Sequence, residues 1–297
     1  MFNWFRKSHQ ALSSDEDFYL LTWDSCRYDT FVAARTPHLS AIDKPRKAYT
    51  MATYTLPAHV AMFNGFLPHC FDAEPFYNRF VQQLWRISHR SVKIKPLVTF
   101  NLGTPNVVEG FRRRGYFTTG LAAMDWFRDA KILQQGFSAF EVTGSGARMQ
   151  HAKLFKQLES RPKQACFAFI NYGETHSPFK YEGMPAQEAV AQPDDRFSLA
   201  RLFNQQGVKV KDWNFDEKHF RMQVAAAEFL DTVTGDLVAF IRKRGRPTTV
   251  ILCGDHGECF GEEGLFGHAI YHEKVMEVPL MIFRLNAPPH EPPQAAK

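Results

Sequence analysis

Short apolar runs recur along this chain and predict the strands of a buried sheet. Consecutive apolar or β-branched residues without polar alternation are typical of strands that are covered on both faces. The runs are Phe18–Trp23, Tyr116–Ala122, Cys166–Ile170, Thr248–Cys253 and Val278–Phe283. Because such strands need packing on both sides, the pattern predicts a sheet in the interior of the molecule.

Segments with helical periodicity separate these runs. The longest is Glu217–Arg244, and Gly245 and Pro247 follow it as residues that end a helix. Further helices are predicted over Arg27–Ala34, from Pro57 to Gly65, from Thr104 to Arg114 and over Ala147–Glu159. Strands alternating with helices predict an α/β fold in which a mainly parallel central sheet is sandwiched between helices.

At 297 residues the chain is long enough for one well-filled α/β domain or for two small ones, and we interpret residues 1–297 as a single domain. Gly183–Asn214 is polar and weakly periodic, so we expect an insertion or lid there. Residues 286–297 are rich in Pro and Ala and are expected to form a frayed tail.

Composition narrows the class of partner. The net charge of +5 is mild and scattered, which argues against nucleic-acid binding and favours an anionic small-molecule or modified-macromolecule substrate. No run is long enough to span a membrane, and the N-terminus lacks the apolar core of a secretory signal. The 5 cysteines have no zinc-ligand spacing and are expected to be reduced. These features predict a cytoplasmic protein and leave its oligomeric state open.

Candidate metal ligands follow two of the predicted strands. Asp24 ends the first strand, and Asp255 and His256 come directly after Thr248–Cys253 and one glycine. In parallel sheets, sites form beyond the carboxyl ends of the strands. Two carboxylates and an imidazole suit zinc or manganese better than calcium or magnesium. The alternatives are that Asp24 caps a helix and that Asp255 and His256 belong to a polar turn.

Thr55 is the candidate nucleophile. It precedes the helix start predicted at Pro57, where exposed amides and the positive end of the helix dipole favour an anion. Coordination to a metal would lower the pKa of its hydroxyl enough for nucleophilic attack. Thr55 is otherwise an ordinary helix cap, and Thr50 and Thr53 are close enough to be rival nucleophiles.

Several other polar residues are candidates for substrate binding. His176 follows the third core strand and His268 follows Asp255 closely, so each is a candidate phosphate ligand, general acid or, with Glu174, ligand of a second metal. The substrate-binding candidates are His59, His176, His268 and Arg27, although Arg27 could equally form a structural ion pair with Asp29. Glu258 is expected to be a solvated or helix-capping charge, and the glycines around it suggest a loop close to a ligand.

Three strings together resemble one protein family. They are Thr22–Asp29, Thr55–Pro68 and Gly254–His268, and Val278–Leu280 matches the strand that follows them. In this order they are similar to the sulfatase-like branch of the alkaline phosphatase superfamily, over about residues 18–284. Each string alone is weakly specific, whereas the ordered set is specific.

The resemblance implies a mixed α/β sheet between helices, with a metal at its carboxyl edge held by Asp24, Thr55, Asp255 and His256. It implies that Thr55 attacks phosphorus and forms a covalent intermediate, which water or another acceptor resolves. His176 and His268 resemble the paired histidines that contact the phosphate, or a second zinc, in phosphoethanolamine transferases and lipoteichoic acid synthases.

The chain departs from the pattern of true sulfatases. They carry a cysteine or serine, oxidised to formylglycine, where Thr55 stands, and threonine cannot form that aldehyde. Phosphate-type esters are therefore the favoured substrates. His59 replaces an arginine and Ser25 a second aspartate, which weakens the case for calcium. Two alternatives stay open: a sulfate-ester hydrolase of the same fold, and a catalytically degenerate binding partner stabilised by a metal.

Overall fold

A seven-stranded sheet forms the centre of the molecule. The computed structural model describes residues 15–65, 106–185, 211 and 213–287. The strand order is β2-β9-β6-β1-β5-β3-β4. The strands are β1 (Asp17–Trp23), β2 (Arg46–Tyr49), β3 (Phe117–Ala122), β4 (Ala139–Val142), β5 (Cys166–Tyr172), β6 (Thr248–Gly254) and β9 (Glu277–Leu285).

The sheet is mainly parallel, as the alternation of strands and helices predicts. Strands β6, β1, β5, β3 and β4 run parallel to one another. Strand β9 is antiparallel to β6, and the edge strand β2 is antiparallel to β9. All seven residues of β5 are buried, which explains why this strand has no polar alternation.

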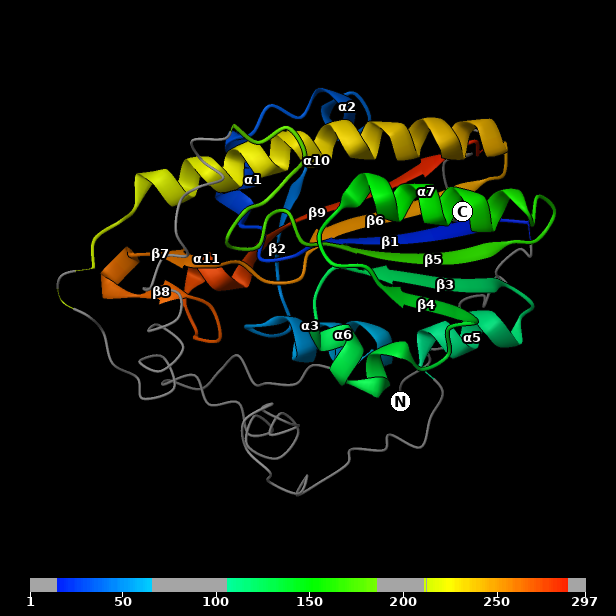
Figure 1. The fold of residues 1–297 in the computed structure, drawn as a ribbon, viewed down its shortest axis with the longest axis horizontal. Coiled ribbons are helices and arrows are strands. Elements are labelled where there is room, and N and C mark those ends of the chain that lie inside the picture. The colour runs from blue at the N-terminus through cyan, green and yellow to red at the C-terminus, as the bar shows by residue number, and fades with distance from the viewer. Residues whose placement is uncertain (1–14, 66–105, 186–210, 212, 288–297) are drawn as a thin grey trace, which may run out of the picture.

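Helices cover both faces of the sheet (Figure 1). On one face lie α1 (Tyr28–Ala33), α2 (Pro37–Ser40), α7 (Ala147–Glu159) and α10 (Glu217–Arg244). On the other lie α3 (Thr55–Asn64), α5 (Val107–Arg113), α6 (Trp126–Asp129) and the 3₁₀ turn η1 (Lys131–Gln134). Each face has its own core: Leu230 of α10 packs in the first cluster and Phe127 of α6 in the second.

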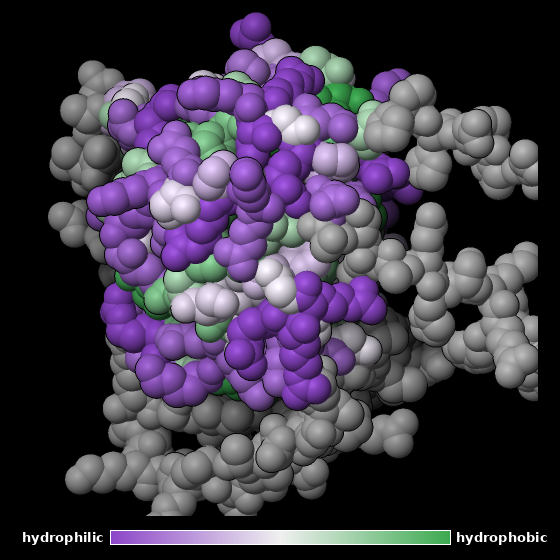
Figure 2. All heavy atoms as spheres, turned by 90° about the vertical axis from the view of Figure 1, so that its right-hand side faces the viewer, coloured by the Kyte–Doolittle hydropathy of each residue, from purple (hydrophilic) through white to green (hydrophobic). Residues whose placement is uncertain are grey.

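A smaller substructure lies beyond the carboxyl ends of the parallel strands (Figure 1). It consists of a hairpin, β7 (Cys259–Phe260) with β8 (Phe266–Gly267), the 3₁₀ turn η2 (Glu262–Gly264) and the short helix α11 (Glu273–Met276). At the opposite end of the sheet, the described surface is largely hydrophilic (Figure 2).

The structure confirms the long elements and corrects some short ones. Helices α7 and α10 have the bounds that periodicity predicts. Helix α3 begins at Thr55 rather than at Pro57, so Thr55 belongs to the first helical turn and Tyr54 is the cap. Helix α5 begins after Asn106, whose side chain accepts a hydrogen bond from the Glu109 amide.

Parts of the interpretation fall outside the described residues. Most of the lid expected at 183–214 and most of the tail expected at 286–297 lie there. The four described cysteines are buried and free, as expected for reduced thiols. Across the described ranges, no helix is long and apolar enough to cross a membrane.

Candidate metal centre

Strand register brings the two aspartates together. Strands β1 and β6 pair in parallel with Trp23 opposite Gly254, so Asp24 and Asp255 leave the sheet side by side. Both side chains are fully buried. Asp24, Asp255 and His256 are the one group of carboxylate, imidazole or thiol ligands, among the described residues, whose ligand atoms lie within 4.8 Å of one another.

Asp255 carries a carboxylate oxygen that the protein leaves unsatisfied. Its Oδ1 accepts hydrogen bonds from the amides of Ser25 and His256, each at 3.0 Å. Its Oδ2 is buried and has no hydrogen-bond partner within the described part of the chain. Burial, together with the charge of Asp24, raises the pKa of Asp255 well above its usual range. An unpartnered, buried carboxylate oxygen is costly unless a cation or proton compensates it.

Asp24 is held as an anion. Burial raises the pKa of Asp24, but the nearby imidazoles of His176 and His256 and a hydrogen bond from Asn171 outweigh it, so that the net pKa is lowered. The Asn171 amide nitrogen lies 3.0 Å from Asp24 Oδ2. Of these two neighbouring carboxyl groups, Asp24 favours the ionised form and Asp255 favours the protonated form.

His256 presents a free nitrogen to this pair. Its Nδ1 donates to the carbonyl of Gly257 at 2.9 Å, which leaves the Nε2 lone pair available. Nε2 lies 3.6 Å from Asp255 Oδ2 and 3.9 Å from Asp24 Oδ1. Burial lowers the pKa of His256 to about 3, so the ring is neutral and can act as a ligand.

Thr55 completes the group. Its hydroxyl lies 3.4 Å from Asp24 Oδ2 and 3.4 Å from His256 Nε2. Tetrahedral ligands at about 2.1 Å from an ion are about 3.4 Å apart, so these separations fit a small divalent metal. The rival Thr50 instead donates its hydroxyl to the carbonyl of Asp255. Thr53 contributes its backbone carbonyl to the amide of Ala269.

His59 is hydrogen-bonded to the backbone of Thr55, which corrects its interpretation as a substrate ligand. The ring is fully buried, and burial lowers its pKa to about 4. Nδ1 donates to the Thr55 carbonyl at 2.8 Å, so the neutral Nε2 accepts from the Thr22 hydroxyl at 3.0 Å. With both ring nitrogens occupied by protein atoms, His59 has no group left for a substrate.

Arg27 is likewise structural in this conformation. Its guanidinium is buried and forms ion pairs with Asp29 at 2.7 Å and Glu262 at 2.6 Å. It also donates to the backbone carbonyl of Glu258 at 3.2 Å. The alternative that Arg27 pairs with Asp29 is therefore the arrangement found, and the guanidinium is not available to a substrate anion.

His176 and His268 do meet at the edge of the cluster. Their ring centroids are 5.5 Å apart, and those of His256 and His268 are 4.6 Å apart. His176 Nδ1 donates to the Ser177 carbonyl, so its Nε2 remains available. The structure thus groups all the histidines that the sequence assigned to phosphate contact, apart from His59.

Glu258 is the functional candidate that the sequence interpretation missed. It is fully buried rather than solvated, and its Oε1 lies 2.9 Å from His268 Nδ1. Burial raises the pKa of Glu258 to about 7. The hairpin explains the contact, because Cys259 pairs with Gly267 and so places the preceding and following residues side by side. That spacing around a short glycine-rich turn was the available signal.

Glu174, in contrast, does not join His176 and His268. Its Oε1 accepts from the Ala147 amide at 2.8 Å, at the start of α7, and its side chain is buried. It therefore compensates a helix N-terminus, where a carboxylate is favoured. Glu258 occupies the place beside His268 that the sequence assigned to Glu174.

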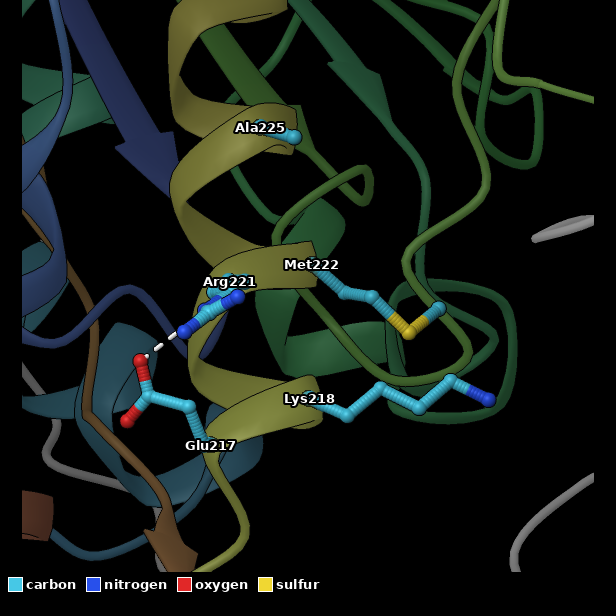
Figure 3. A pocket seen from close by; sticks show the side chains of 5 residues that line it. All are labelled: Glu217, Lys218, Arg221, Met222 and Ala225. Atoms are coloured by element: carbon cyan, nitrogen blue, oxygen red, sulfur yellow. Dashed lines mark hydrogen bonds and ion pairs between the residues drawn. The ribbon is translucent and has the colours of Figure 1, made fainter.

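Two further features, a surface pocket and a buried glycine, are not explained by a ligand of this centre. A pocket on the first turns of α10 is lined by residues of that helix alone, and Arg221 there is paired with Glu217 at 3.0 Å (Figure 3). Gly257 is explained by close packing rather than by a ligand, since a Cβ there would lie 2.0 Å from the Lys274 carbonyl oxygen. The glycine-rich loop expected to approach a ligand is thus partly a packing requirement.

Comparison with protein-family models identifies the family of the chain. The model described as Sulfatase matches residues 23–296. The chain belongs to the sulfatase family. A search of curated protein sequences finds no match.

Solved structures share the fold of this sulfatase-family chain at low sequence identity. The C-terminal periplasmic domain of phosphoethanolamine transferase EptC from Campylobacter jejuni matches 91% of the chain and 80% of its own length, at 11% identity and a TM-score of 0.60. The corresponding EcEptC domain from Escherichia coli, in complex with Zn, matches 91% of the chain and 73% of its own length, at 12% identity and a TM-score of 0.55. Phosphonate monoester hydrolase of Agrobacterium radiobacter matches 90% of the chain and 68% of its own length, at 14% identity and a TM-score of 0.58. Across these and related matches, the chain spans 49% to 80% of the other chain's length.

The comparisons confirm the resemblance to the alkaline phosphatase superfamily and correct the expected location. Matched domains from Campylobacter jejuni and Escherichia coli are periplasmic. These matches contradict the prediction of a cytoplasmic protein, which rested on the cysteines, the N-terminus and the lack of a membrane-spanning run.

Proposed function

We propose that this chain is a metal-dependent hydrolase or transferase of phosphate-type esters that acts through a covalent intermediate on Thr55. The observation that carries the proposal is the position of the Thr55 hydroxyl, 3.4 Å from both Asp24 and His256, beside the unpartnered oxygen of Asp255. Sulfatase-family membership and the likeness to phosphoethanolamine transferases and a phosphonate monoester hydrolase support it.

The donor set favours zinc or manganese. Carboxylates of Asp24 and Asp255, the imidazole of His256 and the oxygen of Thr55 would hold one ion, and the EcEptC domain solved with Zn supports that choice. When bound, the ion would supply positive charge that lowers the pKa of the Thr55 hydroxyl and stabilises negative charge on the phosphoryl group.

The residues of the chain then divide the work. The Thr55 hydroxyl loses its proton to solvent and its oxygen attacks phosphorus. The ester P–O bond breaks, and the leaving oxygen takes a proton from a neighbouring protonated imidazole. His268, supported by Glu258, and His176 are the groups placed for that transfer. Water or an acceptor hydroxyl then attacks the phosphorus and gives its proton to that imidazole, and the released Thr55 oxygen regains a proton from solvent. An anionic ester is the substrate class, and the same His–Glu group would also suit a second metal.

The test is a panel of aryl esters assayed with defined metals. Protein stripped by a chelator is reloaded with zinc, manganese, calcium or magnesium and offered a 4-nitrophenyl phosphate monoester, a phosphodiester, a phosphonate ester and a sulfate ester. Zinc- or manganese-dependent turnover of a phosphorus ester is expected. Faster turnover of the sulfate ester would favour the sulfate-ester hydrolase. No turnover and no bound metal would favour a degenerate binding partner.

A further inference from the structure

A buried glutamine of α10 reaches the candidate metal centre from the opposite side to Thr55. Gln223 is fully buried, and every hydrogen-bonding group of its carboxamide is used. Its Nε2 donates to the carbonyls of Ser25 at 2.8 Å and Thr175 at 2.9 Å. Its Oε1 accepts from the Thr30 hydroxyl at 2.6 Å and the Arg27 amide at 3.3 Å. A carboxamide satisfied in this way fixes its neighbours in one arrangement.

Ser25 is the neighbour that most needs fixing. Its φ of 58° lies in the left-handed region, which is unfavourable for a residue with a Cβ atom. In this conformation its carbonyl meets Gln223, and its amide donates to Asp255 Oδ1 at 3.0 Å. The second of these bonds orients the Asp255 carboxylate so that Oδ2 is left for a ligand.

Thr175 extends the same arrangement to the turn after β5. Its carbonyl accepts from Gln223, while its hydroxyl donates to the backbone carbonyl of Asp24 at 2.7 Å. His176 is the next residue in the chain. One side chain from α10 therefore ties together the two turns that carry Asp24 and His176.

We propose that Gln223 is a positioning residue of the metal centre, which holds the turns after β1 and β5 in the conformation that aims Asp24, Asp255 and His176. This inference rests on the proposed function, since it takes Asp24 and Asp255 as metal ligands. Gln223 touches neither the ion nor the substrate. It acts through the strained backbone of Ser25, in the manner of the outer-shell partners that tune known metal sites.

The experiment is a zinc titration of chelator-treated protein by calorimetry. Gln223→Met keeps the size of the side chain and removes all four hydrogen bonds, so the zinc dissociation constant is expected to rise about 10- to 100-fold. Adding Ser25→Gly to this variant is expected to recover part of the affinity, because glycine adopts positive φ without penalty. A merely structural role predicts no such rescue.

Two further variants keep the test decisive. Gln223→Glu retains the acceptor for Thr30 and Arg27 but loses both donations, so it should also weaken zinc binding. This variant carries the test in case Gln223→Met does not fold. Gln150→Met is the matched control, because Gln150 is an equally buried glutamine that donates to Thr143 and to the Asn171 carbonyl. It is expected to lower the stability of the fold and to keep the wild-type zinc affinity.

Amide hydrogen exchange of the metal-free protein separates the possible failures. Faster exchange at 24–27 and 175–177 in Gln223→Met supports the positioning role, and unchanged exchange there overturns it. Wild-type zinc affinity in both Gln223 variants overturns the inference alone. A wild-type protein that binds no zinc or manganese overturns the proposed function itself.

Discussion

The two ends of the central sheet bury carboxylates in opposite ways. At the amino end, Asp17 is fully buried and accepts from Arg244 at 2.7 Å, Arg246 at 3.0 Å and the Cys166 amide at 3.0 Å. At the carboxyl end, Asp24 and Asp255 are equally buried, yet no lysine or arginine of the described residues forms an ion pair with either.

The difference shows which buried charges are complete within the protein. Asp17 has its counter-charges supplied by Arg244 and Arg246 of the chain. At the other end, the oxygens Asp255 Oδ2 and Glu258 Oε2 are buried without a partner in the described part of the chain. Because uncompensated buried carboxylates are costly, we infer that an external cation completes the carboxyl end.

Replacing the proposed nucleophile, Thr55, should abolish turnover at the carboxyl end of the sheet and leave the ion pairs at the amino end unchanged. Thr55→Ala removes the attacking oxygen, so turnover of an activated phosphorus ester is expected to fall about a thousandfold or more. Thr55→Ser keeps a hydroxyl and should retain measurable activity. Circular dichroism should show the same fold in both variants. Full activity of Thr55→Ala would remove this residue from the mechanism.

Replacing Asp17 should do the reverse. Asp17→Asn leaves the guanidinium groups of Arg244 and Arg246 without their buried carboxylate, and breaking such an ion pair costs about 3 kcal/mol. Urea unfolding is expected to show that loss, while zinc affinity and turnover stay at the wild-type level. A parallel fall in zinc affinity would mean that the two ends are coupled.

Replacing Asp255 should stabilise the metal-free fold while destroying the centre. Burial and Asp24 raise the pKa of Asp255 in the folded state, so ionisation of this residue favours the unfolded state. The free energy of unfolding therefore falls as pH rises above the pKa of an unfolded aspartate, about 3.9. Asparagine can still accept from the amides of Ser25 and His256.

Metal-free Asp255→Asn is therefore expected to be more stable than the wild type at pH 7, by on the order of 1 kcal/mol, and the gain should shrink toward pH 4. Urea unfolding at several pH values measures this difference. A variant that is less stable than the metal-free wild type at neutral pH would contradict the idea of uncompensated charge.

The sequence predicts the sheet and the grouping of the candidate metal ligands, because the apolar runs mark the strands and the candidate ligands follow their carboxyl ends. Asp24 and Asp255 come directly after long apolar runs, and the β1–β6 register then places them together. Short edge strands such as β2, which is mostly exposed, have no apolar run and were not foreseen. Neither was the β7–β8 hairpin, whose pairing brings Glu258 to His268.

The roles of single polar residues were harder to predict, because they depend on partners distant in sequence. His59 and Arg27 both look like anion ligands in the sequence. In the fold, a ring nitrogen of His59 is hydrogen-bonded to Thr22, and the guanidinium of Arg27 is paired with Glu262. Gln223 lies on the buried stripe of a long helix, where an amide reads as an interruption of the apolar pattern. Only the fold reveals that it meets the turn at Ser25.

The most direct measurement is the anomalous diffraction of crystals grown with zinc, recorded at the zinc absorption edge. The account predicts an ion bound by Asp24, Thr55, Asp255 and His256, with each ligand atom at about 2.0–2.2 Å. An ion bound elsewhere, with these four side chains left unliganded at saturating zinc, would contradict it.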